Sequence, residues 1–189
     1  MVAINLLTPN EVAALAQTSA SVVEKVLEQR VLNLVGPARK KRLLPLHAVA
    51  VAVAAKVLGR RLTVDDKRRM ARHLSRLSSA ALKTAEVEVA PAVVVHVGTL
   101  ARDAVERAER YVHARDSFIE SVEGVQGGRP VIRGTRLTVS AIHGRLAGGD
   151  TIEALIEDYP DIPREAFEAA FLYEQTHPQV GRPSIQPGQ

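Results

Sequence analysis

The stretch LTPNEVAALAQTSASVVEKVLEQRV, residues 7–31, decides the fold expected for the first part of this chain. Its segment Thr8-Pro9-Asn10-Glu11 is a typical helix start, because threonine can cap, proline suits the first helical position and glutamate can return a capping bond. We expect a helix to about Ala16, a short turn, and a second helix over about 20–29. Two short helices joined by such a turn form a helix-turn-helix motif.

An extended excursion with a turn at Gly36-Pro37 is expected over residues 30–44. A run of basic residues follows this turn, where it would form the wing of a winged helix-turn-helix. The residues of this run are Arg39, Lys40, Lys41 and Arg42. Such a wing contacts phosphates without reading base sequence.

Further helices and two strands are expected before the last third of the chain. The helices cover about 45–58, 64–78 and 99–114, and the strands cover 86–89 and 93–97. The helix at 45–58 is apolar nearly all round, which predicts burial. It and the helix at 99–114 are the candidate interfaces of a homodimer.

The last third combines glycine-rich turns with short elements. Short strands are expected at 118–121 and 130–133, and helices at 139–146, about 150–159 and about 161–176. The tail 178–189 has no periodicity and is expected to be extended or disordered. The expected fold is therefore mainly α with short β segments.

The charge of the chain changes sign near its middle. Residues 1–89 carry 15 Lys and Arg against 7 Asp and Glu, whereas residues 90–189 carry 10 Arg against 14 Asp and Glu. A basic module can neutralise phosphates, while an acidic one suits protein contact. The break predicts a DNA-binding module at 1–89, a dimerisation and protein-binding module at 90–177, and a flexible tail.

Several classes of protein are disfavoured by composition. Aromatic residues make up 3% of the chain, which gives few platforms for stacking single-stranded nucleic acid. The chain has no cysteine, and its six histidines are not spaced as metal ligands. Phosphate loops and nucleophile elbows are absent, so we expect a non-enzyme without metal or cofactor. No apolar run reaches membrane-spanning length, and a cytoplasmic location is expected.

Residues 117–175 resemble the DUF433 family of antitoxins. The matching stretches are Gly127–Ile132, Arg133–Val139, Gly149–Glu153, Tyr159–Ile162 and the helix through Ala169-Ala170. The resemblance implies a small helix-turn-helix-like module of a VapB-like antitoxin, which partners a PIN-like ribonuclease toxin of the VapC type. Such toxins hold a divalent metal with clustered acidic residues.

Arginine is well suited to contact such an acidic site, because its guanidinium is permanently charged and binds carboxylates in pairs. The candidate toxin-binding residues are Arg129, Arg133, Arg136 and Arg182. High-GC codon usage explains the preference for Arg over Lys in this half equally well, and a solvated surface charge is the alternative role for each residue.

The helix pair at 7–31 is similar to the helix-turn-helix of MerR-like regulators. This resemblance places the start of the second helix in the major groove. The residues that would face DNA there are Ser19, Ser21, Val22 and Lys25. MerR-like proteins usually carry Arg where Val23-Glu24 stand, so Glu24 argues against direct base reading at that point.

The sequence thus favours an antitoxin of a type II toxin–antitoxin system. It would bind a PIN-like ribonuclease toxin, and as a homodimer it would repress its own operon by binding operator DNA. One alternative is a stand-alone transcriptional regulator without a toxin partner. Another is a purely structural interaction module without a DNA role.

Overall fold

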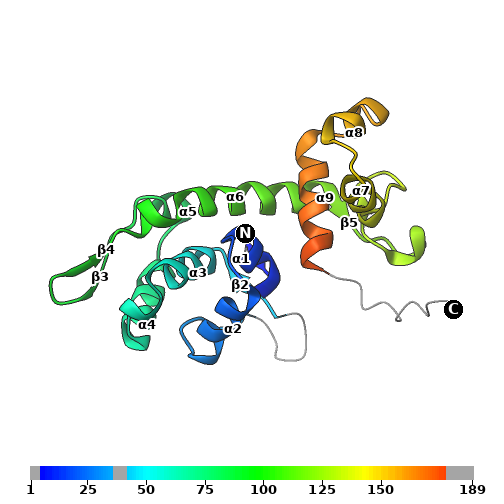
Figure 1. Ribbon diagram of the computed structural model, residues 1–189. Coiled ribbons are helices and arrows are strands. Elements are labelled where there is room, and N and C mark those ends of the chain that lie inside the picture. Colours follow the sequence, from blue (N-terminus) through cyan, green and yellow to red (C-terminus); the bar gives the residue numbers. More distant parts are fainter. Residues whose placement is uncertain (1–4, 36–41, 178–189) are drawn as a thin grey trace, which may run out of the picture. The chain divides into compact units, whose positions relative to one another are not determined.

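The computed structural model describes residues 5–35 and 42–177, and helices dominate this part of the chain (Figure 1). The strands in the described residues form two-stranded antiparallel sheets. The expected class, mainly α with short β segments, is confirmed. The chain divides into two compact units, residues 1–118 and 119–189, which we call the first and the second unit.

The first unit begins with the expected helix pair. Strand β1 (Leu6–Leu7) leads into α1 (Pro9–Leu15), and α2 (Ala20–Glu28) follows after a short turn. The predicted capping box is present, because the Glu11 amide donates to Thr8 Oγ1 at 3.2 Å and the Thr8 amide donates to Glu11 Oε2 at 2.6 Å. The local sequence therefore fixes where the first helix begins.

Helix α3 (His47–Leu58) is the centre of the first unit. The helix was expected to begin at Pro45, but Leu44 and Pro45 form strand β2 (Leu44–Pro45), which pairs with β1, so α3 begins after them. Residues 48–54 are all buried, and α3 packs against α1, α2, α4 and α6. The apolar character of this helix is explained by burial within its own unit, so residues 48–54 do not offer an interface to a second copy.

Beyond α3, the helix expected at 64–78 is shorter than predicted, and a second helix follows that was not predicted. Helix α4 (Val64–Leu74) ends earlier than the pattern predicts, and the short α5 (Ser79–Leu82) follows it. The 3₁₀ turn η1 (Gly59–Arg61) precedes α4, and Thr63 and Asp66 form a second capping box. The two expected strands are confirmed as an antiparallel pair. They are β3 (Val87–Ala90) and β4 (Val93–Val95).

Helix α6 (Val97–Phe118) is longer than expected and closes the first unit. One side of the helix is buried, and it consists of Ala101, Ala104, Val105, Ala108, Tyr111 and Val112. Because α6 packs on α3, the unit extends to Phe118 rather than ending at residue 89. Residues 90–118 carry four arginines and four acidic residues, so the charges of +8 and −4 stay the same with the new boundary.

The second unit is a small helical fold with one strand pair. Strands β5 (Ile119–Glu120) and β6 (Val131–Ile132) pair in antiparallel fashion, with the 3₁₀ turn η2 (Gln126–Gly128) between them. Three helices follow, with α9 packed on both others and Phe167 in the core. They are α7 (Val139–Ala147), α8 (Ile152–Asp158) and α9 (Arg164–Thr176).

Candidate functional site

The exposed start of α2 carries the residues predicted to face DNA. Ser19 is the N-cap residue, and its Oγ lies 2.7 Å from Ser21 Oγ. Ser19, Ser21 and Lys25 are exposed, while Val22 is partly covered. Val23 and Val26 anchor the opposite side of the helix in the core. The four predicted residues thus share the outward side of a short helix, with three polar side chains free to meet a ligand.

The base of the expected wing is an antiparallel bridge between Val35 and Leu43. The Val35 amide donates to the Leu43 carbonyl at 2.7 Å. Three predicted wing residues lie outside the described residues, and these are Arg39, Lys40 and Lys41. Val35 and Leu43 therefore pair as the two strands of a hairpin would pair, while the predicted turn at Gly36-Pro37 lies outside the described residues.

Arg42 joins this hairpin to α2. Its two terminal nitrogens donate to Glu24 Oε1 at 3.0 Å and to Glu24 Oε2 at 2.8 Å. This hydrogen-bonded pair raises the pKa of Arg42. Glu24 is therefore not an isolated negative charge on α2. This pair was not predicted, because its two partners lie 18 residues apart in the chain.

Other basic side chains of the first unit hold the ends of the two short helices. Lys56 Nζ donates to the Gln17 carbonyl at 2.8 Å, and Arg107 donates to the Leu15 carbonyl at 3.1 Å. Arg68 donates twice to the Gln29 carbonyl at the end of α2, at 2.8 and 3.2 Å. Cations at these carbonyl-rich helix ends stabilise the helix pair. These three positively charged side chains are thus already bound to backbone carbonyls and stabilise the first unit.

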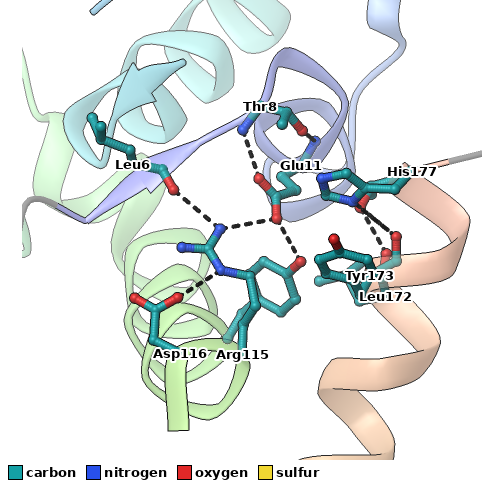
Figure 2. A network of polar contacts seen from close by, with 10 residues as sticks. Leu6, Thr8, Glu11, Arg115, Asp116, Leu172, Tyr173 and His177 are labelled. Carbon is teal, nitrogen blue, oxygen red and sulfur yellow. Dashed lines mark hydrogen bonds and ion pairs between the residues drawn. The ribbon is translucent and has the colours of Figure 1, made fainter. Parts of the chain in front are cut away.

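A buried carboxylate fastens the start of α1 to α6 (Figure 2). Glu11 is 1% exposed, and its Oε1 accepts hydrogen bonds from the Tyr111 hydroxyl at 2.6 Å and from Arg115 at 3.0 Å. Arg115 also donates to the Leu6 carbonyl and to Asp116. Burial alone would lower the pKa of Arg115, but the two carboxylates raise it. We call Glu11, Tyr111 and Arg115 the carboxylate lock.

In the second unit, a tight turn presents two of the predicted arginines. We call residues 133–136, Arg-Gly-Thr-Arg, the arginine turn. The Ile132 carbonyl accepts from the Thr135 amide at 3.0 Å and from its hydroxyl at 2.8 Å. Gly134 has φ +72°, a conformation that favours glycine, and its amide donates to Glu120. The turn is therefore held at several points by its own backbone, by Thr135 and by Glu120.

The arginines of this turn are exposed. Arg133 lies 4.0 Å from Glu120, and Arg136 is exposed without a hydrogen bond or ion pair to any described residue. Arg129, just before β6, is likewise exposed and unpaired among the described residues. Arg182 lies outside the described residues. Two of the predicted toxin-binding side chains are thus free to meet an anionic partner.

Two further arginines of the second unit are already paired. Arg145 bridges Asp150 at 2.6 Å and Asp158 at 2.7 Å, and both carboxylates raise the pKa of Arg145. Arg164 pairs with Glu153. These pairs join neighbouring helices, so they set Arg129 and Arg136 apart from the structural arginines of the same unit.

Neither a metal centre nor a membrane span is found in the described residues. Within 5–35 and 42–177, no three or more histidine or acidic side chains gather as metal ligands would. In the same ranges, no helix is long and apolar enough to cross a membrane.

Comparison with known proteins places a family match in the second unit. Residues 119–173 match the family described as "Protein of unknown function (DUF433)". An uncharacterized protein of Sinorhizobium fredii, y4eO, is 33% identical over 81 residues, which cover 43% of this chain and 36% of the relative. The chain thus aligns with about a third of that relative's length. No solved structure matches. The second unit therefore carries a DUF433 region, which extends from β5 into α9.

Proposed function

We propose that this protein is the antitoxin of a type II toxin–antitoxin system, with operator DNA as the ligand of the first unit and a PIN-like ribonuclease toxin as the partner of the second. The observation that carries the proposal is the pairing of two unlike units in one chain. A basic helix-turn-helix unit is followed by an acidic unit with a DUF433 region and free arginines.

The DNA-binding half rests on charge and on the outward side of α2. Residues 1–118 carry 19 Lys and Arg against 11 Asp and Glu, an excess that attracts phosphates. The exposed Ser19, Ser21 and Lys25 are suited to a major groove, with the wing base beside α2. A homodimer is expected on a two-fold symmetric operator. The exposed side of α6 is its candidate interface.

The toxin-binding half rests on the arginine turn. Residues 119–189 carry 6 Arg against 10 Asp and Glu, so this unit as a whole would be repelled by DNA. Arg129 and Arg136 nevertheless offer free guanidinium groups. Paired carboxylates, such as those that hold the metal of a PIN-like ribonuclease, match the two parallel donors of such a group. Repression of the operon would be the task of the first unit, through its binding of operator DNA.

Co-expression with the adjacent gene tests the toxin half. If that gene encodes the toxin, the full chain should rescue growth and the two proteins should co-purify. The R129E/R136E variant should lose both effects through like-charge repulsion. The matched control is R60E/R61E, which reverses two exposed charges on η1 of the first unit and should keep both effects.

Binding of the upstream promoter tests the DNA half and the alternative. The full chain should bind a promoter fragment with an affinity that falls as salt rises, and the K25E variant should bind more weakly. Promoter binding together with a harmless neighbour that does not co-purify would instead support a stand-alone regulator. A chain without promoter binding would contradict the DNA role.

A further inference from the structure

Helix α4 carries exposed arginines on the side that faces away from the core. Its buried side consists of Lys67, Met70, Ala71 and Leu74. The opposite side carries Arg69 and Arg72, and Arg76 continues it in the turn directly after the helix. All three are exposed, and we call them the basic stripe. They span about 10 Å along the helix axis.

Two of the three arginines of the stripe, Arg72 and Arg76, have no acidic residue three or four positions away, whereas Arg69 interacts with Asp66. The acidic residues of α4 are Asp65 and Asp66 in its first turn, where Asp65 pairs with Arg68 and Asp66 caps the helix. The side chains of Arg72 and Arg76 make no hydrogen bond or ion pair with any described residue. Their side chains are thus available to an external anion.

Helix α6 of the same unit shows the usual alternative. Its outer side mixes both signs, with Arg102 and Arg110 among Asp103, Glu106 and Glu109. Like charges three and four residues apart destabilise a helix, whereas mixed charges stabilise it. Arg72 lies in the last turn of α4 and Arg76 follows it, where positive charge is favourable to the helix. Unlike Arg102 and Arg110, however, neither has an acidic residue three or four positions away, which leaves both available to an anionic partner.

The position of α4 favours DNA as that partner. Arg68 donates to the Gln29 carbonyl, which places the first half of α4 beside the end of α2 (Figure 1). A span of about 10 Å matches the rise of roughly three nucleotides along one strand of duplex DNA. The described exposed side of α4 lacks large apolar residues, which insertion into a lipid surface would require.

We propose that the basic stripe is a second, sequence-independent DNA contact, which binds the phosphates of the duplex beside the site occupied by α2. The inference rests on the proposed DNA-binding function. Because phosphates carry no sequence information, the stripe raises the affinity for every duplex by the same factor. Base discrimination is left to α2.

A binding experiment at several salt concentrations tests this contact. It compares the affinity of the full chain for its promoter fragment with its affinity for an unrelated duplex of equal length. The R72Q/R76Q variant should lose about tenfold or more in affinity for both duplexes, and the slope of log K against log salt should fall by about 2. The matched control R60Q/R61Q removes two exposed charges from η1, outside the stripe and outside the candidate dimer interface, and should keep the wild-type slope. Thermal melting checks that both variants are folded.

Three outcomes would overturn the proposal. An R72Q/R76Q variant with the wild-type slope shows that the stripe does not contact phosphates, while the DNA-binding function itself stands. A wild-type chain that binds neither duplex overturns both the stripe and the proposed function. Unchanged DNA binding with lost capture of vesicles of equal parts phosphatidylglycerol and phosphatidylcholine would assign the stripe to a lipid surface.

Discussion

At the scale of single residues, Gln17 and Arg30 hold the backbone turns that end α1 and α2. Both have positive φ, +50° and +53°. The amides that follow them bond back across the turn, from Thr18 to Ala13 and from Val31 to Val26, each at 2.9 Å. This is the Schellman arrangement, in which glycine usually occupies the left-handed position. The helix pair α1 and α2 is thus built with residues that are strained at these two points.

Gln17→Gly is expected to relieve this strain. Because a left-handed residue with a side chain costs about 1–2 kcal/mol and glycine loses some chain entropy on folding, the free energy of unfolding should rise by about 0.5–1 kcal/mol. Urea unfolding followed by circular dichroism measures the change. Gln17→Ala serves as control, since alanine keeps the strain, and a gain of the same size with alanine would contradict this explanation.

His47, the first residue of α3, gives the first unit a dependence on pH. Burial lowers the pKa of His47 below its ordinary value. The unfolded chain therefore binds a proton near pH 6.5 that the folded chain resists, and stability falls as pH decreases through this window. The urea midpoint should fall between pH 7.5 and 5.5. A His47→Gln variant should show a smaller decrease, and an equal decrease would assign the effect to other groups.

At the scale of elements, the carboxylate lock fastens α1 to α6. Tyr111→Phe removes one hydrogen bond from the buried Glu11 carboxylate, so the free energy of unfolding should fall by about 1–3 kcal/mol. The control Tyr159→Phe removes a hydroxyl from a partly exposed residue of the second unit and should have little effect. Equal losses in the two variants would show that the lock adds no stability.

Local signals in the sequence predicted the elements well. The capping box at Thr8 begins its helix as expected, because caps involve residues only three apart, and the helix expected from residue 64 begins after a similar box at Thr63. The four-residue α5 was not predicted, since so short a segment carries no periodicity. The boundary expected after residue 89 lies after Phe118 in the structure, because α6 packs on α3, and this packing joins parts of the chain that are distant in sequence.

Long-range pairing explains what was not predicted about the site. The start of α2 and the arginine turn could be located from sequence, because helix starts and glycine turns are local. The bonds from Arg42 to Glu24 and from Tyr111 to Glu11 join residues 18 and 100 positions apart. Only the folded structure brings such partners together, so neither pair had a local signal.

At the scale of the whole molecule, we expect the two proposed functions to be separable. Lys25 lies on the first unit and Arg136 on the second, and additivity is usual for distant sites that share no partners. In the K25E/R136E variant, the free-energy losses in promoter binding and in toxin binding should equal those of the single variants. Isothermal titration with each ligand measures both losses. A loss in toxin binding caused by K25E alone would show that the units are coupled.

The carboxylate lock also gives the first unit an optical reporter of its own. The chain has no tryptophan, and Tyr111 is the one tyrosine among residues 1–118. Its ring lies 5.6 Å from the Arg115 guanidinium carbon, at the joint of α1 and α6. With Tyr159 and Tyr173 replaced by phenylalanine, all tyrosine emission would come from that joint. Unfolding of the first unit could then be followed by intrinsic tyrosine fluorescence, because the second unit would have no tyrosine or tryptophan to emit.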